Sequence, residues 1–254
     1  MIKALAARLL QKHRTVSYPD GKPQLPPLFR GKPEIDREKC TRCGKCVAAC
    51  PVQALSLGAF PRLDAARCIF CGECASACAA QALRFTDDFR LAANTREKLV
   101  FPDSHELTAP LDPKLLQIFA RSLKLRQVSA GGCAACEADT NVLSTVVFDL
   151  GRFGVQFVAS PRHADGLLIT GPVTKNMEQA LISTYEALPA PKIVIAAGAC
   201  ACSGGLFQEH PQTRGIPASI PVSLYVPGCP PHPLTILDGI LRLLGRIPHA
   251  SGKR

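Results

Sequence analysis

Two short stretches, residues 40–51 (CTRCGKCVAACP) and residues 68–79 (CIFCGECASACA), decide the fold of the first part of the chain. Each has the spacing C-x2-C-x2-C-x3-C, in which three thiolates hold one cubic iron–sulfur cluster and the fourth reaches a neighbouring cluster. The pattern therefore predicts two [4Fe–4S] clusters that exchange one ligand. Cluster 1 takes Cys40, Cys43, Cys46 and Cys78, and cluster 2 takes Cys50, Cys68, Cys71 and Cys74.

The two stretches belong to an internal duplication of strand, cluster loop and short helix. This predicts an α+β, two-cluster ferredoxin-like domain over residues 34–90, in which the fourth cysteine of each run starts the short helix. Gly44 and Gly72 lie in the loops, where the backbone must approach the cluster sulfurs closely. Paired zinc sites are the alternative, but they would leave the third and fourth cysteines of each run unexplained.

The residues before this domain, 1–33, combine a helix and an extended arm. Apolar residues among positions 2–10 recur at the period of an amphipathic helix, with basic residues between them. Two interpretations stay open for this helix: docking on a partner subunit, or lying in a membrane interface. Residues 15–33 contain five prolines, which predicts an extended arm that lies across another surface through Tyr18, Leu28 and Phe29.

The second half of the chain has the pattern of an α/β domain. Prolines mark a linker over residues 91–124, which ends in a helix from Pro113 to about Leu125 with Asp112 as its N-cap. From residue 125 to residue 254, apolar strand-like runs alternate with helical patterns, which predicts a flavodoxin-like parallel sheet covered on both faces. Strands are expected at 125–130, 155–160, 166–171, 192–198 and 222–228, and helices at 137–153, 175–188 and 233–245.

The cysteines of this second domain follow its predicted strands. Sites in parallel sheets form from the loops at the carboxyl ends of strands, so these cysteines should meet at one edge and hold a third cluster. Cys202 is a rival to Cys200, but a leftover buried cysteine usually serves as a small apolar residue, and Cys200 is favoured. The predicted ligands of cluster 3 are Cys133, Cys136, Cys200 and Cys229.

Composition and charge narrow the class of protein. The 13 cysteines accompany no secretory signal and no apolar run long enough to cross a membrane, so we expect a cytoplasmic chain with metal-binding thiols. The formal net charge is +10, and three clusters of about −2 each would lower it to about +4. Residues 1–39 hold nine Lys or Arg against four Asp or Glu, which favours an acidic partner or lipid surface over nucleic acid. We expect no nucleic-acid partner.

Four motifs, taken in chain order, resemble a known family. GGCAACEADTNVL (131–143), LLITGPVT (167–174), GACACSGGLF (198–207) and VPGCPPHP (226–233) resemble the small-subunit family shared by NiFe hydrogenases and the twenty-kilodalton subunit of respiratory complex I. The first cysteine pair is adjacent in complex I relatives. The C-x2-C spacing here resembles membrane-bound, energy-converting hydrogenases related to formate hydrogenlyase. SYP, FRGKPE and CIFCGEC resemble the ferredoxin-like subunit of the same complexes, so the chain looks like a fusion of two neighbouring subunits.

The resemblance implies an electron-transfer subunit. Its three clusters would carry electrons to or from a NiFe centre on a separate large subunit, with cluster 3 nearest that centre. The implied partners are this large subunit, membrane subunits that hold the chain on the inner face of the cell membrane, and a donor: formate dehydrogenase, CO dehydrogenase or ferredoxin. A complex I-like quinone- or antiporter-linked oxidoreductase without nickel is the alternative. A free-standing ferredoxin-like carrier or structural zinc protein is a third hypothesis, from a different class.

We expect no catalytic residue in the chain, but three side chains near cluster 3 have open interpretations. Glu137 is either a proton-transfer group facing the large subunit, as the resemblance implies, or an acid that stabilises a helix N-terminus. Asp139 has the same second interpretation. His232 either donates to a cluster sulfur or only packs in its loop, and packing is favoured.

Overall fold

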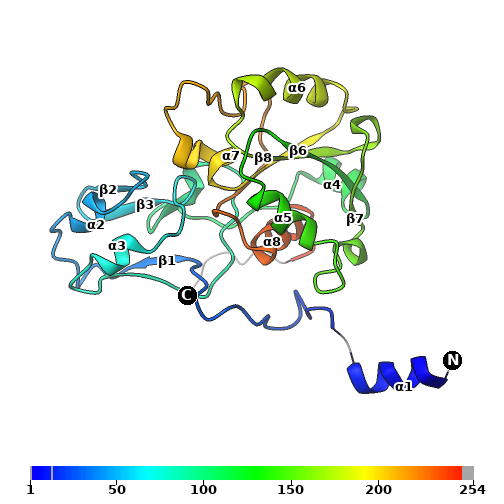
Figure 1. Cartoon of the computed structure of the whole chain (residues 1–254), viewed down its shortest axis with the longest axis horizontal. Coiled ribbons are helices and arrows are strands. Elements are labelled where there is room, and N and C mark those ends of the chain that lie inside the picture. Colours follow the sequence, from blue (N-terminus) through cyan, green and yellow to red (C-terminus); the bar gives the residue numbers. More distant parts are fainter. Residues whose placement is uncertain (1, 13, 248–254) are drawn as a thin grey trace.

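The computed structural model describes residues 2–12 and 14–247. It begins with the amphipathic helix α1 (Ile2–Gln11), which has no buried residue and projects away from the body of the molecule (Figure 1). The arm after it runs back to the body. Tyr18 is buried and Phe29 packs partly buried, as predicted for residues that lie across a surface, whereas Leu28 is exposed. No helix in the described ranges is long and apolar enough to cross a membrane.

The ferredoxin-like part consists of two small antiparallel sheets and two short helices. β1 (Pro33–Ile35) pairs with β4 (Leu83–Phe85). β3 (Pro61–Asp64) pairs on one side with β2 (Leu55–Leu57) and on the other with β5 (Val100–Phe101), which comes after the 3-10 helix η1 (Glu97–Leu99). The short helices are α2 (Lys45–Ala48) and α3 (Glu73–Ser76). Part of the expected linker therefore completes a sheet of this region.

The position of the fourth cysteine differs from the prediction. Cys50 and Cys78 come just after α2 and α3, not at their starts, and it is the third cysteine of each run that lies inside the helix. The helices start early because Gly44 (φ 73°) and Gly72 (φ 87°) turn the chain in the left-handed region that glycine tolerates best. The position of the fourth cysteine is thus determined by the C-terminal end of the helix, not by its start.

The second part is a five-stranded parallel sheet. Its strands have the order β10-β9-β8-β6-β7, which in chain order is 2-1-3-4-5. The strands are β6 (Leu123–Ser129), β7 (Val155–Phe157), β8 (Gly166–Thr170), β9 (Ile193–Ala197) and β10 (Leu224–Val226). β8 and β9 are buried along their whole length, as expected for strands covered on both faces.

Helices cover both faces of this sheet (Figure 1). α8 (Pro233–Leu243) is buried at every position and shares a core with Leu125, Leu168 and Ile195 of the sheet. α6 (Lys175–Glu186) contributes Leu181 to the core on the opposite face. The remaining helices are α4 (Pro113–Phe119), α5 (Ala135–Val142), α7 (Ala199–Ser203), and the 3-10 helices η2 (Leu150–Phe153), η3 (Pro161–His163) and η4 (Gly205–Phe207).

Two helices are much shorter than the sequence suggested. α4 has the predicted cap, since the Asp112 carboxylate accepts from the amides of Lys114 and Leu115, but it ends at Phe119 because β6 already begins at Leu123. α5 ends at Val142, and the residues after it turn instead of continuing as a helix to residue 153. The β-branched residues at 145–147 have lower helix propensity, which agrees with this end.

The two parts of the molecule are packed as one. A single buried core includes Cys68 and Cys74 of the ferredoxin-like part together with Ala201 and Cys202 from α7. The Ser203 hydroxyl donates to the Ala66 carbonyl at 2.8 Å across the same boundary. Ala93 and Tyr225 form an isolated antiparallel bridge. The position of the ferredoxin-like loops relative to the sheet is therefore fixed by apolar packing and by backbone pairing.

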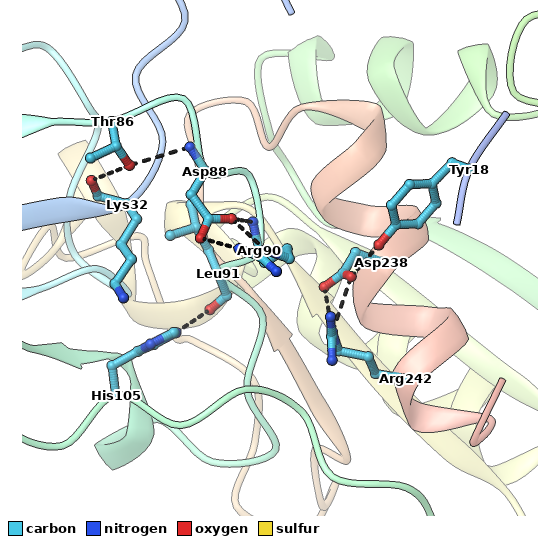
Figure 2. Close-up of polar contacts among 9 residues, drawn as sticks. All are labelled: Tyr18, Lys32, Thr86, Asp88, Arg90, Leu91, His105, Asp238 and Arg242. Carbon is cyan, nitrogen blue, oxygen red and sulfur yellow. Dashed lines mark hydrogen bonds and ion pairs between the residues drawn. The ribbon is translucent and has the colours of Figure 1, made fainter. Parts of the chain in front are cut away.

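A set of hydrogen bonds and ion pairs also joins the N-terminal part of the chain to the sheet domain (Figure 2). The buried carboxylate of Asp238 on α8 accepts a hydrogen bond from the Tyr18 hydroxyl and is paired with Arg242 at 2.9 Å. The Tyr18 ring also meets Phe89 edge-on, with ring centroids 5.5 Å apart. Nearby, Arg90 pairs with Asp88 at 2.7 Å. The arm, the exit of the ferredoxin-like part and the last helix thus meet at one place.

Candidate metal centres

The four cysteines predicted for cluster 1 line one cavity of about 190 Å³. Ile35, Pro61 and Leu83 form apolar parts of its wall. Cys46 is buried, whereas Cys43 is exposed at the surface. Burial, and then the neighbouring thiolates of Cys78 and Cys40, raises the pKa of Cys46. The fourth cysteine of the second run therefore lies with the first three of the first run, as an exchange of ligands would require, and the ligand assignment itself stays a prediction.

The predicted ligands of cluster 2 also gather. Burial raises the pKa of Cys68 to about 12, and the thiolates of Cys74, Cys50 and Cys71 add to this effect. The pKa of Cys74 is raised to about 11 by burial and then by Cys50 and Cys71. Backbone amides already point at these sulfurs: Ala54 donates to the Cys50 Sγ at 3.2 Å and Phe70 donates to the Cys68 Sγ at 3.3 Å.

The chemistry of these thiol sets fits iron–sulfur clusters. Buried thiols that lie close together lose their protons only when a cation compensates the crowded negative charge, and iron supplies that charge. Within residues 2–12 and 14–247, no three His, Cys, Asp or Glu side chains are placed to share a single metal ion. The cluster 1 thiols surround a cavity, and backbone amides donate to the sulfurs of Cys50 and Cys78. Both features suit an anionic group larger than a single metal ion, such as a cluster.

The predicted ligands of cluster 3 meet at the carboxyl edge of the parallel sheet. Cys133 and Cys136 come after β6, Cys200 lies in α7 after β9, and Cys229 comes after β10. Burial, and then the thiolates of Cys200, Cys229 and Cys133, raises the pKa of Cys136 to about 12. The pKa of Cys200 is raised to about 11 for the same reasons. Three separate loops thus bring four thiols to one place.

Gly198 makes this convergence possible. It comes directly after β9 with a φ of 95°, and a Cβ at this position would lie 2.5 Å from the Cys136 Sγ. Any side chain there would displace the thiol, and the left-handed φ would strain it as well. The loop after β6 and the loop after β9 can therefore touch only through a glycine.

Cys202 lies apart from the cluster 3 set. It is 6% exposed, belongs to the core between the two parts, and its thiol points at the carbonyls of Ala196 (3.6 Å) and Val226 (3.7 Å). Burial raises its pKa well above the usual range. The two cysteines of α7 are separated by two positions and so face different sides of the helix.

Glu137 occupies the first turn of α5 and is held by two strand ends. Its Oε1 accepts from the Ser129 hydroxyl at 2.5 Å, at the end of β6, and from the Thr170 hydroxyl at 2.6 Å, at the end of β8. Partial burial opposes ionisation, but these hydrogen bonds keep the pKa of Glu137 below its usual value. Ser129 and Thr170 were not predicted from the sequence, although their positions at strand ends were a usable signal.

His232 and Asp139 line a cavity of about 220 Å³ together with Cys229. His232 is the N-cap of α8, and its Nδ1 accepts from the Leu234 amide at 3.1 Å. Its ring also meets Phe29 edge-on, with centroids 5.3 Å apart. Burial lowers the pKa of His232 and raises that of Asp139. His232 therefore has a packing and capping role in the described structure.

Comparison with known proteins agrees with both parts of the molecule. The family described as "NADH ubiquinone oxidoreductase, 20 Kd subunit" matches residues 133–243, and the "4Fe-4S binding domain" family matches residues 33–56. An NADH-quinone oxidoreductase subunit of Geotalea daltonii is 47% identical over 116 residues, which are 46% of this chain and 68% of that protein.

Two hydrogenase-related proteins are also similar. The probable membrane-bound hydrogenase subunit of Pyrococcus furiosus is 43% identical over 135 residues, covering 53% of this chain and 81% of that protein. Formate hydrogenlyase subunit 7 of Escherichia coli is 40% identical over 151 residues, covering 58% of this chain and 59% of that protein. A chain from the archaeal membrane-bound sulfane sulfur reductase is 33% identical, with a TM-score of 0.44, covering 56% of this chain and 78% of that one.

The fold and the cysteine sites define an iron–sulfur component of an oxidoreductase. The chain belongs to the family of the 20 kDa subunit of NADH-ubiquinone oxidoreductase, joined in one polypeptide to a 4Fe-4S binding segment. The predicted family resemblance is thereby confirmed.

Proposed function

We propose that this chain is the electron-transfer subunit of a membrane-associated NiFe hydrogenase complex. In this proposal it passes electrons through three [4Fe–4S] clusters to or from a nickel–iron site on a separate large subunit. The convergence of four thiols from three strand-end loops, in contact with the ferredoxin-like part, is the observation that carries it. When bound, the clusters would supply one-electron transfer.

Three sets of four cysteines would each hold one of the clusters. Cys40, Cys43, Cys46 and Cys78 would hold cluster 1, whose cavity reaches the surface at Cys43. Cys50, Cys68, Cys71 and Cys74 would hold cluster 2, against the core shared with α7. Cys133, Cys136, Cys200 and Cys229 would hold cluster 3, with Cys133 and Cys229 exposed towards a partner. The donor would then deliver electrons at cluster 1, and the large subunit would cover cluster 3.

We also propose the following division of the chain: an N-terminal helix and arm (1–33), a two-cluster ferredoxin-like domain (34–90), a linker (91–124) and a flavodoxin-like cluster domain (125–254). The linker contains one α-helix, α4, together with the strand β5 that completes a sheet of the ferredoxin-like part. The 2-1-3-4-5 strand order supports the flavodoxin-like name, because doubly wound sheets of that kind use this order. Partners would include membrane subunits that hold the complex on the cytoplasmic face, and a donor such as formate dehydrogenase, CO dehydrogenase or ferredoxin.

Glu137 would face the large subunit and exchange protons with it. Support comes from its position beside Cys136 and from the two hydroxyls that fix its Oε1. Those same hydroxyls would orient the carboxylate and leave its second oxygen towards the partner.

The test is metal analysis of the chain purified anaerobically with its clusters. Three clusters require about twelve irons and about twelve sulfides per chain. Cys229→Ser should lose about four of each and keep the two N-terminal clusters. A loss of about eight irons would contradict the proposed division, and zinc without sulfide would contradict the proposal as a whole.

A complex I-like, quinone- or antiporter-linked oxidoreductase without nickel is the second candidate. The similarity to the NADH-quinone oxidoreductase subunit of Geotalea daltonii, at 47% identity, favours it. The C-x2-C spacing of Cys133 and Cys136 favours the hydrogenase. Nickel in the large subunit that copurifies with this chain would decide for the first candidate, and its absence from an active complex would decide for the second.

A further inference from the structure

Arg30, near the end of the N-terminal arm, lies against the loop that would hold cluster 2. A Cβ on Gly72, between Cys71 and α3, would lie 2.7 Å from the Arg30 Nε and 3.1 Å from its Cζ. The guanidinium group therefore covers the backbone of this glycine. Gly72 has a φ of 87° and leaves no side chain between the guanidinium and the loop.

The backbone around Arg30 is held in place. The next two residues, Gly31 and Lys32, donate backbone hydrogen bonds to the carbonyls of Thr86 (2.7 Å) and Asp88 (2.8 Å) at the exit of the ferredoxin-like part. Gly31 is itself in close contact, since a Cβ there would lie 2.2 Å from the Asp88 carbonyl oxygen. Arg30 is thus attached to a fixed stretch of the arm.

The charge of Arg30 has no ion-pair partner among the described residues. Most other arginines of the ferredoxin-like part are paired with acids: Arg37 and Arg62 with Asp103, Arg67 and Arg96 with Asp64, Arg84 with Glu34, and Arg90 with Asp88. An arginine placed over a cluster loop without a carboxylate suits an anion that the loop itself binds. A [4Fe–4S] cluster with four thiolates is such an anion, with a charge of about −2.

Arg30 also faces the side of cluster 3. It lines the same cavity of about 220 Å³ as Phe70 of the cluster 2 loop and Cys229 of the cluster 3 loop. Phe29, its neighbour in the chain, packs on His232 next to Cys229. The arm therefore passes between the two cluster loops, and Arg30 is the cation at this passage. Asp139 lines the cavity as well and is the acidic residue of its wall.

We propose that Arg30 is a positioning residue for electron transfer, whose charge raises the reduction potential of cluster 2. The proposal rests on the cluster assignment made above. Reduction adds one negative charge to the cluster, so a fixed cation beside the loop stabilises the reduced form more than the oxidised form. Cluster 2, at the boundary between the two parts, is thereby easier to reduce than it would be without Arg30.

The test is a redox titration of the cluster-loaded chain with dithionite, monitored by EPR. Arg30→Gln should shift the midpoint of one cluster to a more negative potential and leave the other two unchanged. Arg30→Lys keeps the charge and should retain most of the original potential. Lys22→Gln is the matched control, because it removes one exposed charge from the same arm and should shift no cluster.

Repeating Arg30→Gln together with Cys229→Ser assigns the shift. Loss of cluster 3 should leave the shift in place, since it belongs to cluster 2. Three outcomes would each overturn the proposal. The shift could disappear when cluster 3 is lost, all clusters could shift equally in both Arg30→Gln and Lys22→Gln, or all three midpoints could stay unchanged in Arg30→Gln. Iron content near twelve per chain in the variants shows that they are folded and loaded; a low value in the unmodified chain would instead contradict the proposed function.

The ionic strength of the titration provides a second check. Because Arg30 is exposed, salt screens its charge, and the difference between the original chain and Arg30→Gln should shrink as salt is raised. A difference that does not depend on salt would indicate a change of loop geometry and overturn the electrostatic role.

Discussion

The hydroxyl of Tyr18 donates a hydrogen bond to the buried carboxylate of Asp238, which lies 220 positions further along the chain. Burial of Tyr18, together with the adjacent negative charge, raises its pKa far above the usual range, so the hydroxyl remains a donor. Arg242 pairs with the same carboxylate from the next turn of α8. The arm is therefore attached to α8, which is buried at every position, through the Asp238 carboxylate. This buried charge is stabilised by the hydrogen bond that Tyr18 donates.

Replacing Tyr18 with phenylalanine should release the arm. A hydrogen bond to a buried charged group contributes about 1.5–3 kcal/mol, and its loss leaves Asp238 with Arg242 alone. The Val16 amide, which donates to the Val147 carbonyl at 2.8 Å, should then exchange with solvent roughly 10- to 100-fold faster. Tyr185→Phe, on the distant helix α6, is the control and should leave this exchange rate unchanged. Equal protection of Val16 in Tyr18→Phe would contradict the anchoring role.

Gly198→Ala should remove cluster 3 without removing the other two. The new Cβ would lie 2.5 Å from the Cys136 Sγ, so the thiol or the strand end must move. Gly215→Ala is the matched control, because Gly215 also has a positive φ but nothing lies within 4 Å of its Cβ position. We expect a loss of about four irons in Gly198→Ala only. Full iron content in both variants would show that the contact tolerates a methyl group.

Cys202→Ala should keep all three clusters. Its thiol lies in the core between the two parts and points at two backbone carbonyls, so the change removes one buried atom and should destabilise the chain by about 1 kcal/mol. EPR of the reduced variant should show the same three signals as the original chain. Cys200→Ala is the comparison and should lack one of them. A missing signal in Cys202→Ala would reverse the choice between the two cysteines.

The stability of the chain should fall as the pH drops towards 5, in part through His105. Burial lowers the pKa of His105 to about 4, while its ring stacks on Phe101 with centroids 4.1 Å apart. Between pH 6.5 and pH 4 the unfolded chain binds a proton that the folded chain does not, so stability is present at neutral pH and lost on acidification. The contribution amounts to about 2 kcal/mol between pH 7 and pH 5.

The measurement is the urea midpoint of the cluster-loaded chain at these two pH values. His105→Phe keeps an aromatic ring on Phe101 but cannot bind a proton, so its midpoint should fall less on acidification than that of the original chain. The difference between the two chains gives the effect of His105 on the urea midpoint, because both chains share any acid sensitivity of the clusters. Parallel pH responses in both chains would show that His105 is not the group responsible.

The cysteine spacing predicted much of the candidate site because covalent geometry links spacing to ligand position. That spacing predicts that the two clusters exchange their fourth cysteines, and the strand-end rule placed Cys133 and Cys229 at one edge of the sheet. The assignment of individual ligands stays a prediction until the clusters are measured. The predicted position of Cys50 at the start of α2 was wrong by one helical turn, because Gly44 starts that helix earlier than the pattern suggests.

Contacts between segments that are distant in the chain could not be predicted from the sequence. Tyr18 was expected to lie on some surface, but its partner Asp238 sits in a helix whose pattern is that of an ordinary apolar core element. Arg30 looked like one more basic residue of the arm. Its place over Gly72 depends on how the two parts pack, and no local propensity or periodicity reports that packing. The helix end at Phe119 was likewise set by a neighbouring segment of the fold, the strand β6 that begins at Leu123.

The core shared by Cys68, Cys74 and Cys202 has a consequence for the biogenesis of the protein. Cys68 and Cys74 are buried in this core beside Ala201 and Cys202 of α7, so the proposed cluster 2 would lie between side chains of both parts of the chain. Inserting that cluster while the two parts are still apart would not require the shared core to open.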